Sequence, residues 1–561
     1  MAVNGSGTLP TSGHVSVVVI GYNDAPHIGD AVRSALAQGP AVAEVLVVDD
    51  ASTDRTAAVL ERMRAGEPRL RVIRRTVNSG GCGTPRNQGL AAATAPYVMF
   101  LDSDDLLPHG AVTTLLEAAL RHDVPVAAGL CVRRELPRRH DTPWQPALYR
   151  RPAVHARPEE HAALLRDTLC VNKLYARAFL TAHGVLFPEG AFRYEDFVFG
   201  ARLLAAAPRI ATVPATVYIW HVRRDAARPS LSLDRNAVAN WEARLRAHRH
   251  SLDALRAADN PVLTHAAKVK FLDHDLRMYV RELPGHGPAH RRAWWAVTRD
   301  ALTAFDEADL RAARAPARWI ARVVLASPAP RDLDRLAQLA ARPARLLPPY
   351  ASAADGPVWA SDLPQVALDG LTGPSAKPAR RLPVTVDATL RTGRRSPRAV
   401  LTLRVHELYG RLAAARPHTV DVELRLRGPG TAVTLSAPLE RDGPAWTAAV
   451  PLDLGGLAAH GRRAAGRAPQ AWDVRVGLRF ARDGTLRTAV RAHGGPLRRT
   501  ALPSARFGLL LAQPCATGSS SLAIRLAPGP RCALGVLLRR LGRLRRHVTR
   551  RRGRGRHRAA R

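Results

Sequence analysis

Short apolar runs that end in polar residues alternate with helical stretches over the first 234 residues of the chain. Residues 15–20 (VSVVVI) and 44–50 (EVLVVDD) are nearly continuous apolar runs, which is typical of parallel strands buried on both faces. Residues 26–39 between them have helical spacing and end in a glycine. This alternation predicts a doubly wound, mostly parallel α/β sheet that binds ligands at the carboxyl ends of its strands.

Two further runs extend the same pattern. Residues 71–75 (RVIRR) and 95–105 (APYVMFLDSDD) predict a third and a fourth strand, and residues 53–64 predict a helix between the second strand and the third. Because side chains that follow parallel strands gather at one edge of such a sheet, polar residues at these positions are candidates for a binding site.

The pattern changes twice farther along the chain. Residues 236–347 have the spacing of helices, whereas seven runs after residue 383 alternate apolar and polar side chains with a period of two. Each such strand needs a second sheet to cover its apolar face, so we expect an all-β sandwich. The predicted segments are a disordered N-terminus (1–13), an α/β domain (14–235), a helical region (236–347), a linker (348–382), a β-sandwich (383–528) and a basic Arg-rich tail (529–561).

Composition excludes several classes of protein. With 46% hydrophobic residues, the chain has too much apolar surface for an intrinsically disordered protein. We find no signal peptide, and no apolar run approaches the roughly 18–20 residues of a spanning helix. The five cysteines form no CxxC pair, which argues against a disulfide scaffold or a zinc ribbon. We therefore expect a cytoplasmic protein, with peripheral contact at the inner face of the membrane as a further option.

The formal net charge of +37 comes from an excess of arginine along the whole chain and from a cluster of arginines near its C-terminal end. Only four of the basic residues are lysine, which indicates a compositional bias toward arginine. Such a bias raises the net charge without selection for an anionic partner. Residues 531–561, in contrast, contain 13 arginines and no acidic residue. This tail fits an amphipathic helix on anionic lipid, a site for an anionic polymer, or a solvated tail. No aromatic residue interleaves its arginines, so nucleic acid is not an expected partner.

Two acidic residues follow the second predicted strand. Asp49 and Asp50 come directly before Ser52 and Thr53, which are suited to cap the next helix. A carboxylate at this edge is able to accept a hydrogen bond from a nucleotide base or from ribose. In the alternative interpretation, both acids only stabilise the helix N-terminus.

A glycine-rich segment, NSGGCGTPRNQG at 78–89, follows the third predicted strand. Glycines permit close approach of the backbone to a ligand, and Arg86 is suited to meet an anion. The segment is neither a Walker loop nor a complete GxGxxG motif, and by itself it predicts an ordinary turn.

The fourth predicted strand runs directly into Asp102, Asp104 and Asp105. Clustered carboxylates repel one another unless a cation lies among them. Mg²⁺ and Mn²⁺ prefer oxygen ligands of this kind and complete their coordination with substrate phosphates and water. The D-x-D pattern after a buried strand therefore predicts a divalent-metal site.

A second acidic pair, Glu195 and Asp196, lies in the segment FRYEDFVFGARLL at 192–204, where it opens an amphipathic helix. In one interpretation the pair only meets the positive end of the helix dipole. In the other, Asp196 is a general base, which requires access to an acceptor hydroxyl.

Five motifs in this order resemble glycosyltransferase family 2, the inverting nucleotide-sugar enzymes with a GT-A fold: VSVVVIGYND, VVDDASTD, NSGGCGTPRNQG, LDSDD and YED. The resemblance covers residues 15–234, and residues 170–196 are similar to the subgroup that decorates bacterial cell-surface polymers, including wall teichoic acid. Enzymes of that subgroup also carry C-terminal sandwich domains. The family usually has proline in the turn after the first strand and glycine after the Asp pair, where this chain has Gly21-Tyr22 and Ala51. The identity of the nucleotide therefore stays open.

The resemblance also implies roles for the candidate residues. On the donor side, the implied nucleotide-sugar contacts are Tyr22, Asp24, Asp49, Asp50, Arg86, Asp102 and Ser103, with Asp49 or Asp50 on the uracil. Asp102, Asp104 and His221 would hold Mn²⁺ or Mg²⁺, with Asp104 as the direct ligand. Residues 223–232 resemble the closing segment of the family. The implied catalytic pair is Asp196, as the base, with Glu195, and Asn172 and Lys173 would lie on the acceptor side.

The resulting hypothesis is a metal-dependent inverting hexosyl- or N-acetylhexosaminyltransferase. It would move a sugar from a nucleotide sugar, expected to be a UDP-sugar, to an envelope polysaccharide, a polyol-phosphate polymer or a lipid-linked acceptor. Two alternatives are a polysaccharide polymerase that uses two donors and an inactive carbohydrate-binding protein of the same fold. For the β-sandwich, the sequence leaves open a spacer, a polymer-binding module and a homo-oligomer contact.

Overall fold

The computed structural model describes residues 14–137, 139–223, 235, 237–341, 344, 346–347, 350–354, 356–370, 378–382, 384–393, 396–407, 411–428, 431–443, 445–465, 468–481, 484–492, 498–517 and 521–535. The chain divides into two compact units: Met1–Tyr279 with Gly285–Ala313 and Pro328–Pro330, and Val280–Pro284 with Arg314–Ser327 and Arg331–Arg561. The division passes through the predicted helical region, and the six sequence segments stay predictions. The predicted N-terminal segment and residues 536–561 of the basic tail lie outside the described residues.

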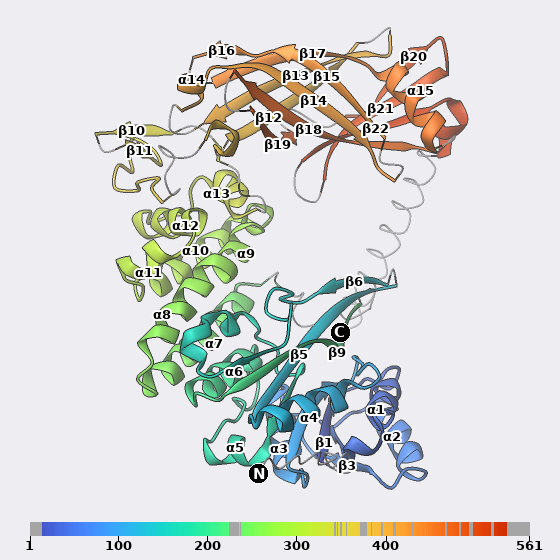
Figure 1. The fold of residues 1–561 in the computed structure, drawn as a ribbon, viewed down its shortest axis with the longest axis vertical. Helices are drawn as coiled ribbons and strands as arrows, with labels where there is room; N and C mark the ends of the chain where they lie inside the picture. Colours follow the sequence, from blue (N-terminus) through green and yellow to red (C-terminus); the bar gives the residue numbers. More distant parts are fainter. Residues whose placement is uncertain are drawn as a thin grey trace, which may run out of the picture. The chain divides into compact units, whose positions relative to one another are not determined.

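A mostly parallel sheet forms the centre of the first unit (Figure 1). Its strands are β1 (Val15–Gly21), β2 (Val42–Asp49), β3 (Leu70–Arg74), β4 (Tyr97–Asp102), β5 (Val126–Leu136), β6 (His140–Pro143), β7 (Ala153–His155), β8 (Lys173–Ala176) and β9 (Ile210–Arg223). They pair in the order β3-β2-β1-β4-β8-β5-β9-β7, with β6 beside β5. The first four strands are parallel, as predicted, and the strand order reverses between β1 and β4, where open α/β sheets bind ligands.

Helices pack against this sheet and bury it. They are α1 (Ile28–Leu36), α2 (Thr56–Arg64), α3 (Gly83–Ala92), α4 (Ala111–His122), α5 (Arg177–Ala182) and α6 (Glu195–Ala205), with short 3₁₀ segments η1 (Gly39–Ala41) and η2 (Pro158–Arg166). Every residue of β1 is buried, which explains why its sequence is a continuous apolar run rather than an alternating one.

Helices continue through the next hundred residues: α7 (Val238–Ala257), α8 (Pro261–Lys270), η4 (Phe271–Leu276), α9 (Arg277–Val280), η5 (Leu283–Gly285), α10 (Pro288–Leu302), α11 (Glu307–Ala312), α12 (Ala315–Ala326) and α13 (Leu333–Ala340). The backbone passes from α8 into η4 without a break, and η4 is a π-helix. Helix α7 packs against α6. In the described part of the chain, no helix combines the length and the apolar character needed to cross a membrane.

The segment predicted as a linker contains ordered structure. Strands β10 (Ala351–Ala353) and β11 (Gly356–Val358) pair as a hairpin. The indole of Trp359 is buried, and the guanidinium of Arg335 lies 3.9 Å from the centre of its ring. Trp319 donates a hydrogen bond to the carbonyl of Asp369 (2.9 Å). These side chains anchor the proline-rich stretch to α12 and α13.

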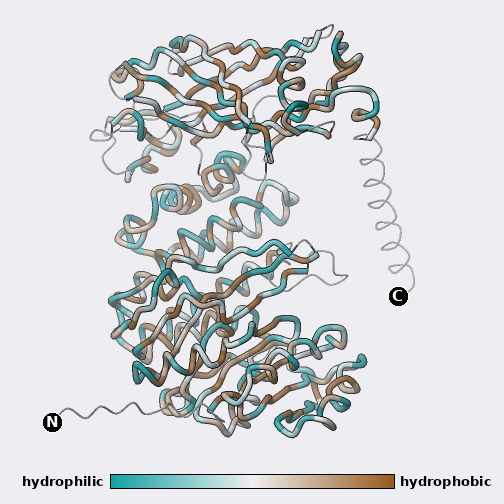
Figure 2. Tube along the Cα trace, turned by 45° about the vertical axis from the view of Figure 1, so that its right-hand side comes forward, coloured by the Kyte–Doolittle hydropathy of each residue, from teal (hydrophilic) through white to brown (hydrophobic). Residues whose placement is uncertain are grey.

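The C-terminal region is rich in β-structure. Its strands are β12 (Val384–Thr392), β13 (Arg398–Glu407), β14 (Pro417–Leu426), β15 (Ala432–Pro438), β16 (Glu440–Asp442), β17 (Ala445–Asp453), β18 (Gln470–Phe480), β19 (Gly484–Ala492), β20 (Thr500–Ser504), β21 (Gly508–Ala516) and β22 (Leu522–Pro528), with helical segments η6 (Ala379–Arg381), α14 (Arg411–Ala415) and α15 (Leu454–Ala465). The seven predicted runs correspond to β12–β15 and β17–β19. Exposed and buried residues alternate along β13, and Figure 2 shows the matching alternation of hydropathy along these strands.

The two antiparallel parts of this C-terminal sheet are joined by one parallel pair, β12 with β19. Both parts contribute to a single apolar core, in which Leu401 and Leu403 of β13 and Val420 and Val422 of β14 are completely buried. The predicted fold class, an α/β domain followed by helices and a C-terminal all-β region, is confirmed.

Candidate active site

The loops that follow β1, β2 and β4 are tied together at one edge of the first sheet. The strands are in register there, with Gly21 opposite Asp49 and Ile20 opposite Asp102. Asp24 connects two of the loops, because its Oδ2 accepts a hydrogen bond from the Ser103 hydroxyl (2.7 Å). Its other oxygen lies 2.5 Å from Nδ1 of His27. The predicted donor-side residues Asp24 and Ser103 are thus in direct contact with each other.

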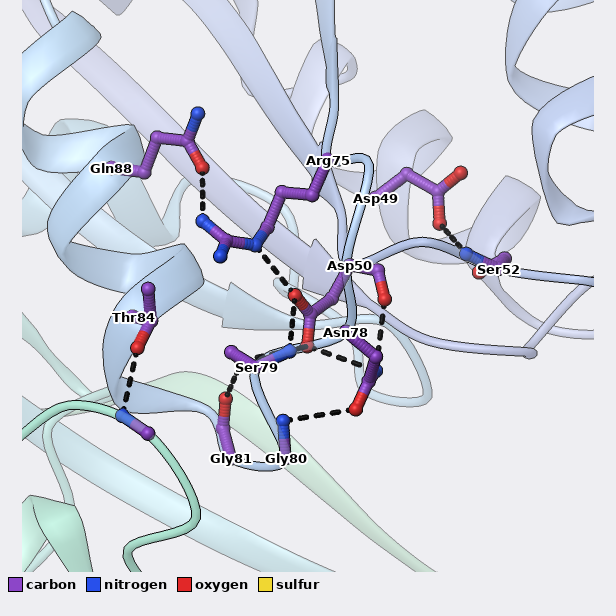
Figure 3. Close-up of polar contacts among 11 residues, drawn as sticks. Asp49, Asp50, Ser52, Arg75, Asn78, Ser79, Gly80, Gly81, Thr84 and Gln88 are labelled. Atoms are coloured by element: carbon purple, nitrogen blue, oxygen red, sulfur yellow. Dashed lines mark hydrogen bonds and ion pairs between the residues drawn. The ribbon is translucent and has the colours of Figure 1, made fainter.

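Asp49 has one satisfied oxygen and one unsatisfied oxygen. Its Oδ1 accepts a hydrogen bond from the backbone N–H of Ser52 (3.0 Å) (Figure 3). Its Oδ2 is buried and has no hydrogen-bond partner among the described residues, although Nε of the exposed Arg74 lies 3.8 Å away. A buried acceptor without a partner costs about 1–3 kcal/mol, so this oxygen is suited to accept a hydrogen bond from a ligand.

Asp50, the neighbouring acid, is fully engaged by the protein. Its carboxylate accepts hydrogen bonds from the hydroxyl of Ser79 (2.8 Å) and the amide of Asn78 (3.1 Å), and it pairs with Nε of Arg75 (2.7 Å). These contacts, drawn in Figure 3, hold the loop that precedes α3. Asp50 therefore positions a loop, whereas Asp49 keeps an oxygen available.

The glycine-rich segment at the start of α3 approaches another part of the protein, not an open ligand site. A Cβ at Gly81 would lie 2.4 Å from the carbonyl oxygen of Gly190, and one at Gly83 would lie 2.0 Å from that of Pro188. Asn87 also exchanges two hydrogen bonds of 2.9 Å with the backbone of Phe187. The segment therefore fixes the chain that leads into α6 and its acidic pair.

Arg86 joins the D-x-D motif to the acidic pair. Its guanidinium donates to Oδ1 of Asp102 (2.7 Å) and to Oε1 of Glu195 (2.5 Å). The side chain is only 4% exposed and lies over the ring of Phe187. Arg86 was predicted to lie against the nucleotide, but its charge is already shared between two carboxylates of the protein. In the structure, Arg86 therefore holds the end of β4 and the start of α6 in position relative to each other.

The acids after β4 have different surroundings. Asp104 is 41% exposed and pairs with Arg223 (3.1 Å). Its pKa is raised to about 6, first by burial and then by the charge of Asp102. Asp105 is buried, and its carboxylate accepts hydrogen bonds from the hydroxyl of Tyr218 and the backbone N–H of His221, both at 2.7 Å. Asp105 thereby fixes β9 to the D-x-D loop.

His221 lies beside this loop, as predicted. Its Nδ1 is 3.0 Å from the carbonyl oxygen of Asp104. Burial lowers the pKa of His221 and thereby favours the neutral ring. A neutral ring that donates from Nδ1 to this carbonyl keeps a lone pair on Nε2, which is the form that binds metals.

These groups fit a divalent cation held partly by substrate. No cluster of three His, Cys, Asp or Glu residues with metal-binding geometry is present among the described residues. Asp102 and Asp104 are partly exposed, and their carboxylates repel each other. Mg²⁺ and Mn²⁺ bind to one or two carboxylates when substrate phosphates supply further oxygens. The donor set therefore suits a metal that arrives with a nucleotide diphosphate.

Asp196 lies on the wall of a pocket that is partly open to solvent. The pocket lies between the sheet, α6 and the helices that follow, and its wall includes Arg244, Lys270 and Asp275. The pKa of Asp196 is raised to about 7 by burial and by the charge of Glu195. A carboxylate with this pKa is matched to proton transfer near neutral pH.

Asn172 and Lys173 belong to a buried polar network. Lys173 Nζ lies 2.6 Å from Asp167 Oδ2, which also accepts a hydrogen bond from the amide of Asn172 (3.1 Å). Asn172 additionally donates to the carbonyl of Gly129 (2.8 Å) and is completely buried. The structure therefore does not expose Asn172 to an acceptor, whereas Lys173 and Asp167 line the pocket.

The sequence reasoning missed the helical part of this site. Arg244 lies on α7, Lys270 ends α8 and Asp275 lies in η4, within a region that was predicted only as helices. Other charged residues lie two positions from each of them, so no local pattern in the sequence singles them out. Tyr22, a predicted nucleotide-sugar contact, directly follows β1 and is 41% exposed. Residues 224–232 of the expected closing segment lie outside the described residues.

Residues 16–178 match the family model "Glycosyl transferase family 2". The chain is 32% identical to the succinoglycan biosynthesis protein ExoO of Rhizobium meliloti, over 43% of this chain and 70% of that protein. It is 31% identical to the poly(ribitol-phosphate) beta-N-acetylglucosaminyltransferase TarS of Staphylococcus aureus, over 37% of this chain but only 36% of that protein. The crystal structure of S. aureus TarS aligns over 92% of this chain and 85% of that one, with a TM-score of 0.47 and 18% identity.

Proposed function

Because the chain belongs to glycosyl transferase family 2, we propose that it moves a sugar from a UDP-sugar to a hydroxyl of a bacterial envelope polymer, with inversion at the anomeric carbon. The observation that carries the proposal is the contact path from Asp102 through Arg86 to Glu195. This path fixes the D-x-D loop relative to the helix that bears Asp196. The names of the relatives, for succinoglycan synthesis and for N-acetylglucosaminyl transfer to poly(ribitol phosphate), support the acceptor class and the sugar class.

On the donor side, Asp49 is the group that accepts the N–H of the base. Its buried Oδ2 lacks a partner, and the carboxylate of Asp50 is already saturated. Mn²⁺ or Mg²⁺ would be held by Asp104, with Asp102 and His221 beside it. When bound, the cation offsets the negative charge on the departing diphosphate.

On the acceptor side, Asp196 takes the proton of the attacking hydroxyl. The acceptor oxygen forms a bond to the anomeric carbon from the face opposite the phosphate, and the bond from that carbon to the phosphate oxygen breaks. A single displacement of this kind inverts the configuration. The raised pKa of Asp196 makes its carboxylate a stronger base than an exposed aspartate.

We also propose that the reaction takes place in the cytoplasm. The five cysteines lie within the described residues and form no disulfide there, which fits a reducing compartment. Contact of the basic tail with an anionic membrane and self-association through the C-terminal sheet stay predictions, and the tail from residue 536 onward lies outside the described residues.

The decisive experiment measures nucleotide release by the full chain from UDP-, GDP- and dTDP-sugars by mass spectrometry, with Mn²⁺, Mg²⁺ or a chelator. We expect UDP release that the metal stimulates. Asp104→Asn should lose the stimulation, whereas Asp253→Asn, a matched change at an exposed residue of α7, should keep it. Release that is equal with chelator and in Asp104→Asn would overturn the metal assignment. Failure to bind any nucleotide sugar would overturn the proposed function.

A further inference from the structure

The pocket beside Asp196 contains a buried cation that the proposed reaction does not use. Lys270, the last residue of α8, is 16% exposed, and its Nζ lies 4.0 Å from Oδ2 of Asp275. The same nitrogen lies 4.5 Å from the centre of the Phe197 ring. In comparison, Lys173 and Lys268 each have a carboxylate oxygen at 2.6 Å. The charge of Lys270 is therefore less closely compensated than the charges of these two buried lysines.

Asp275 lies closer to Arg244 than to Lys270. Both Nε and Nη2 of Arg244 lie 2.5 Å from Oδ1 of Asp275, and the guanidinium also stacks on the rings of Tyr194 and Phe197. The π-helix η4 carries Asp275 to this position. π-Helices are rare and are frequently found at functional sites. The π-helix thus places the carboxylate of Asp275 in direct contact with Arg244, whereas Lys270 lies farther from the same carboxylate.

Several charged groups act on this part of the pocket. Arg244, Lys270, Asp275 and Asp196 line it, and the charges of Glu195 and Arg86 also act on Asp196. Burial lowers the pKa of His248, which lies on α7 and also lines the pocket, to about 3, so its ring is neutral. A buried cation without a close counter-ion is costly, so an anion beside Lys270 would stabilise its charge.

We propose that this pocket is the acceptor subsite and that Lys270 holds an anionic group of the acceptor, a phosphate or a carboxylate, beside Asp196. The inference rests on the proposed function, since it assigns Asp196 to the acceptor hydroxyl. An acceptor anion would compensate the charge of Lys270, whose nearest carboxylate oxygen in the pocket, on Asp275, lies 4.0 Å away. Pockets with mostly apolar walls and a few converging polar groups are typical ligand sites, and Phe197, Phe199 and Phe271 supply such walls here.

Binding of three probes to the full chain tests this inference. The probes are ribitol 5-phosphate, glucuronate and neutral ribitol, titrated calorimetrically in the presence of UDP. We expect at least one anionic probe to bind ten or more times tighter than ribitol. A stronger response to the phosphate identifies a polyol-phosphate acceptor, and a stronger response to glucuronate identifies an acidic polysaccharide. Equal affinity for all three probes would overturn the proposal without the use of any variant.

Three variants locate the anion. Lys270→Met should abolish the preference for the anionic probe, and Lys270→Arg should retain part of it. Arg249→Met, which removes one exposed charge from α7, should behave as the unmodified protein. An unchanged preference in Lys270→Met contradicts the assignment, and thermal melting of each variant shows whether it is folded. UDP binding, measured on the same samples, distinguishes failure of the proposed function from failure of the subsite. If the unmodified protein does not bind UDP, the proposed function is refuted. If it binds UDP but shows no preference for anionic probes, only the subsite is refuted.

Discussion

The carboxylates at the two sides of the candidate active site differ in how well the protein satisfies them. At the edge of the sheet, Asp24 and Asp50 receive hydrogen bonds from Ser103, Ser79 and Asn78. Beyond the end of β4 and at the start of α6, burial and neighbouring negative charge raise the pKa of Asp104 to about 6 and that of Asp196 to about 7.

This difference separates groups that shape the site from groups that react in it. A saturated carboxylate holds loops in place and gains little from a ligand. A carboxylate whose charge is incompletely compensated is stabilised when a cation or a proton binds to it, and perturbed groups of this kind cluster at functional sites. We therefore expect substitutions on the first side to act on stability and binding, and substitutions on the second side to act on the chemical step.

The largest effect is expected at Asp196. Asp196→Asn removes the base and should lower the rate of transfer by about 10²–10⁴-fold, the usual range for general acid–base catalysis. UDP affinity should stay the same, because the proposed function assigns Asp196 to the acceptor and not to the nucleotide. Transfer rates and UDP titrations check both points, with Asp253→Asn as the control. Transfer that continues at the original rate in Asp196→Asn would mean that another group is the base.

The next effect concerns Arg86, which joins the two sides. Arg86→Met leaves Asp102 and Glu195 without their shared cation and should lower the free energy of unfolding by about 3–5 kcal/mol, as is typical when one partner of a buried ion pair is removed. Arg33→Met breaks the exposed pair with Asp30 and should cost at most about 1 kcal/mol. Urea denaturation measures both values. Similar losses in the two variants would show that the Arg86 contacts contribute no more than a surface pair.

The pH dependence of transfer should show the state of Asp196. Its carboxylate is active when ionised, so the rate should rise with pH and reach half of its maximum near pH 7. Between pH 6 and pH 8 the ionised fraction increases about tenfold for a group with this pKa. The charged groups that act on Asp196 are those of Glu195, Arg86, Arg244 and Lys270. A rate that is flat between pH 6 and pH 8 would contradict this assignment.

The smallest effects should separate Asp49 from Asp50. Asp49→Asn places an amide where the base N–H is expected and should weaken UDP binding by about fivefold, or about 1 kcal/mol, with little change in stability. Asp50→Asn should leave a donor facing the N–H of Ser79 and should mainly lower the free energy of unfolding, by about 1 kcal/mol. Calorimetry and denaturation on both variants test the contrast. The reverse pattern would exchange the two roles.

Local patterns predicted most of the fold. The buried run of β1 and the seven period-two runs define strands because burial on two faces or on one face dictates which residues are apolar. The order of the motifs also predicted the family, which the comparisons confirm. The positions of Asp102 and Asp104 followed from the end of a buried strand.

Other features depend on contacts between distant parts of the chain. The Arg86–Glu195 pair joins residues 109 positions apart, and no local pattern indicates which carboxylate an arginine will meet. The contribution of α7, α8 and η4 to the pocket was missed for the same reason. Asn172 was placed by resemblance near the acceptor, but its burial follows from the packing of Gly129 and Asp167 around it.

The π-helix η4 has a consequence for how such enzymes diversify. A π-turn accommodates one residue more than the α-helix on either side of it. Deletion of Asp275 would let this turn wind as a regular α-helix while the residues on either side keep their faces, and it would leave Arg244 without its counter-ion. The electrostatic character of the pocket would then change. A gain or loss of a single codon can therefore alter the charge of this pocket while the surrounding helices stay in place.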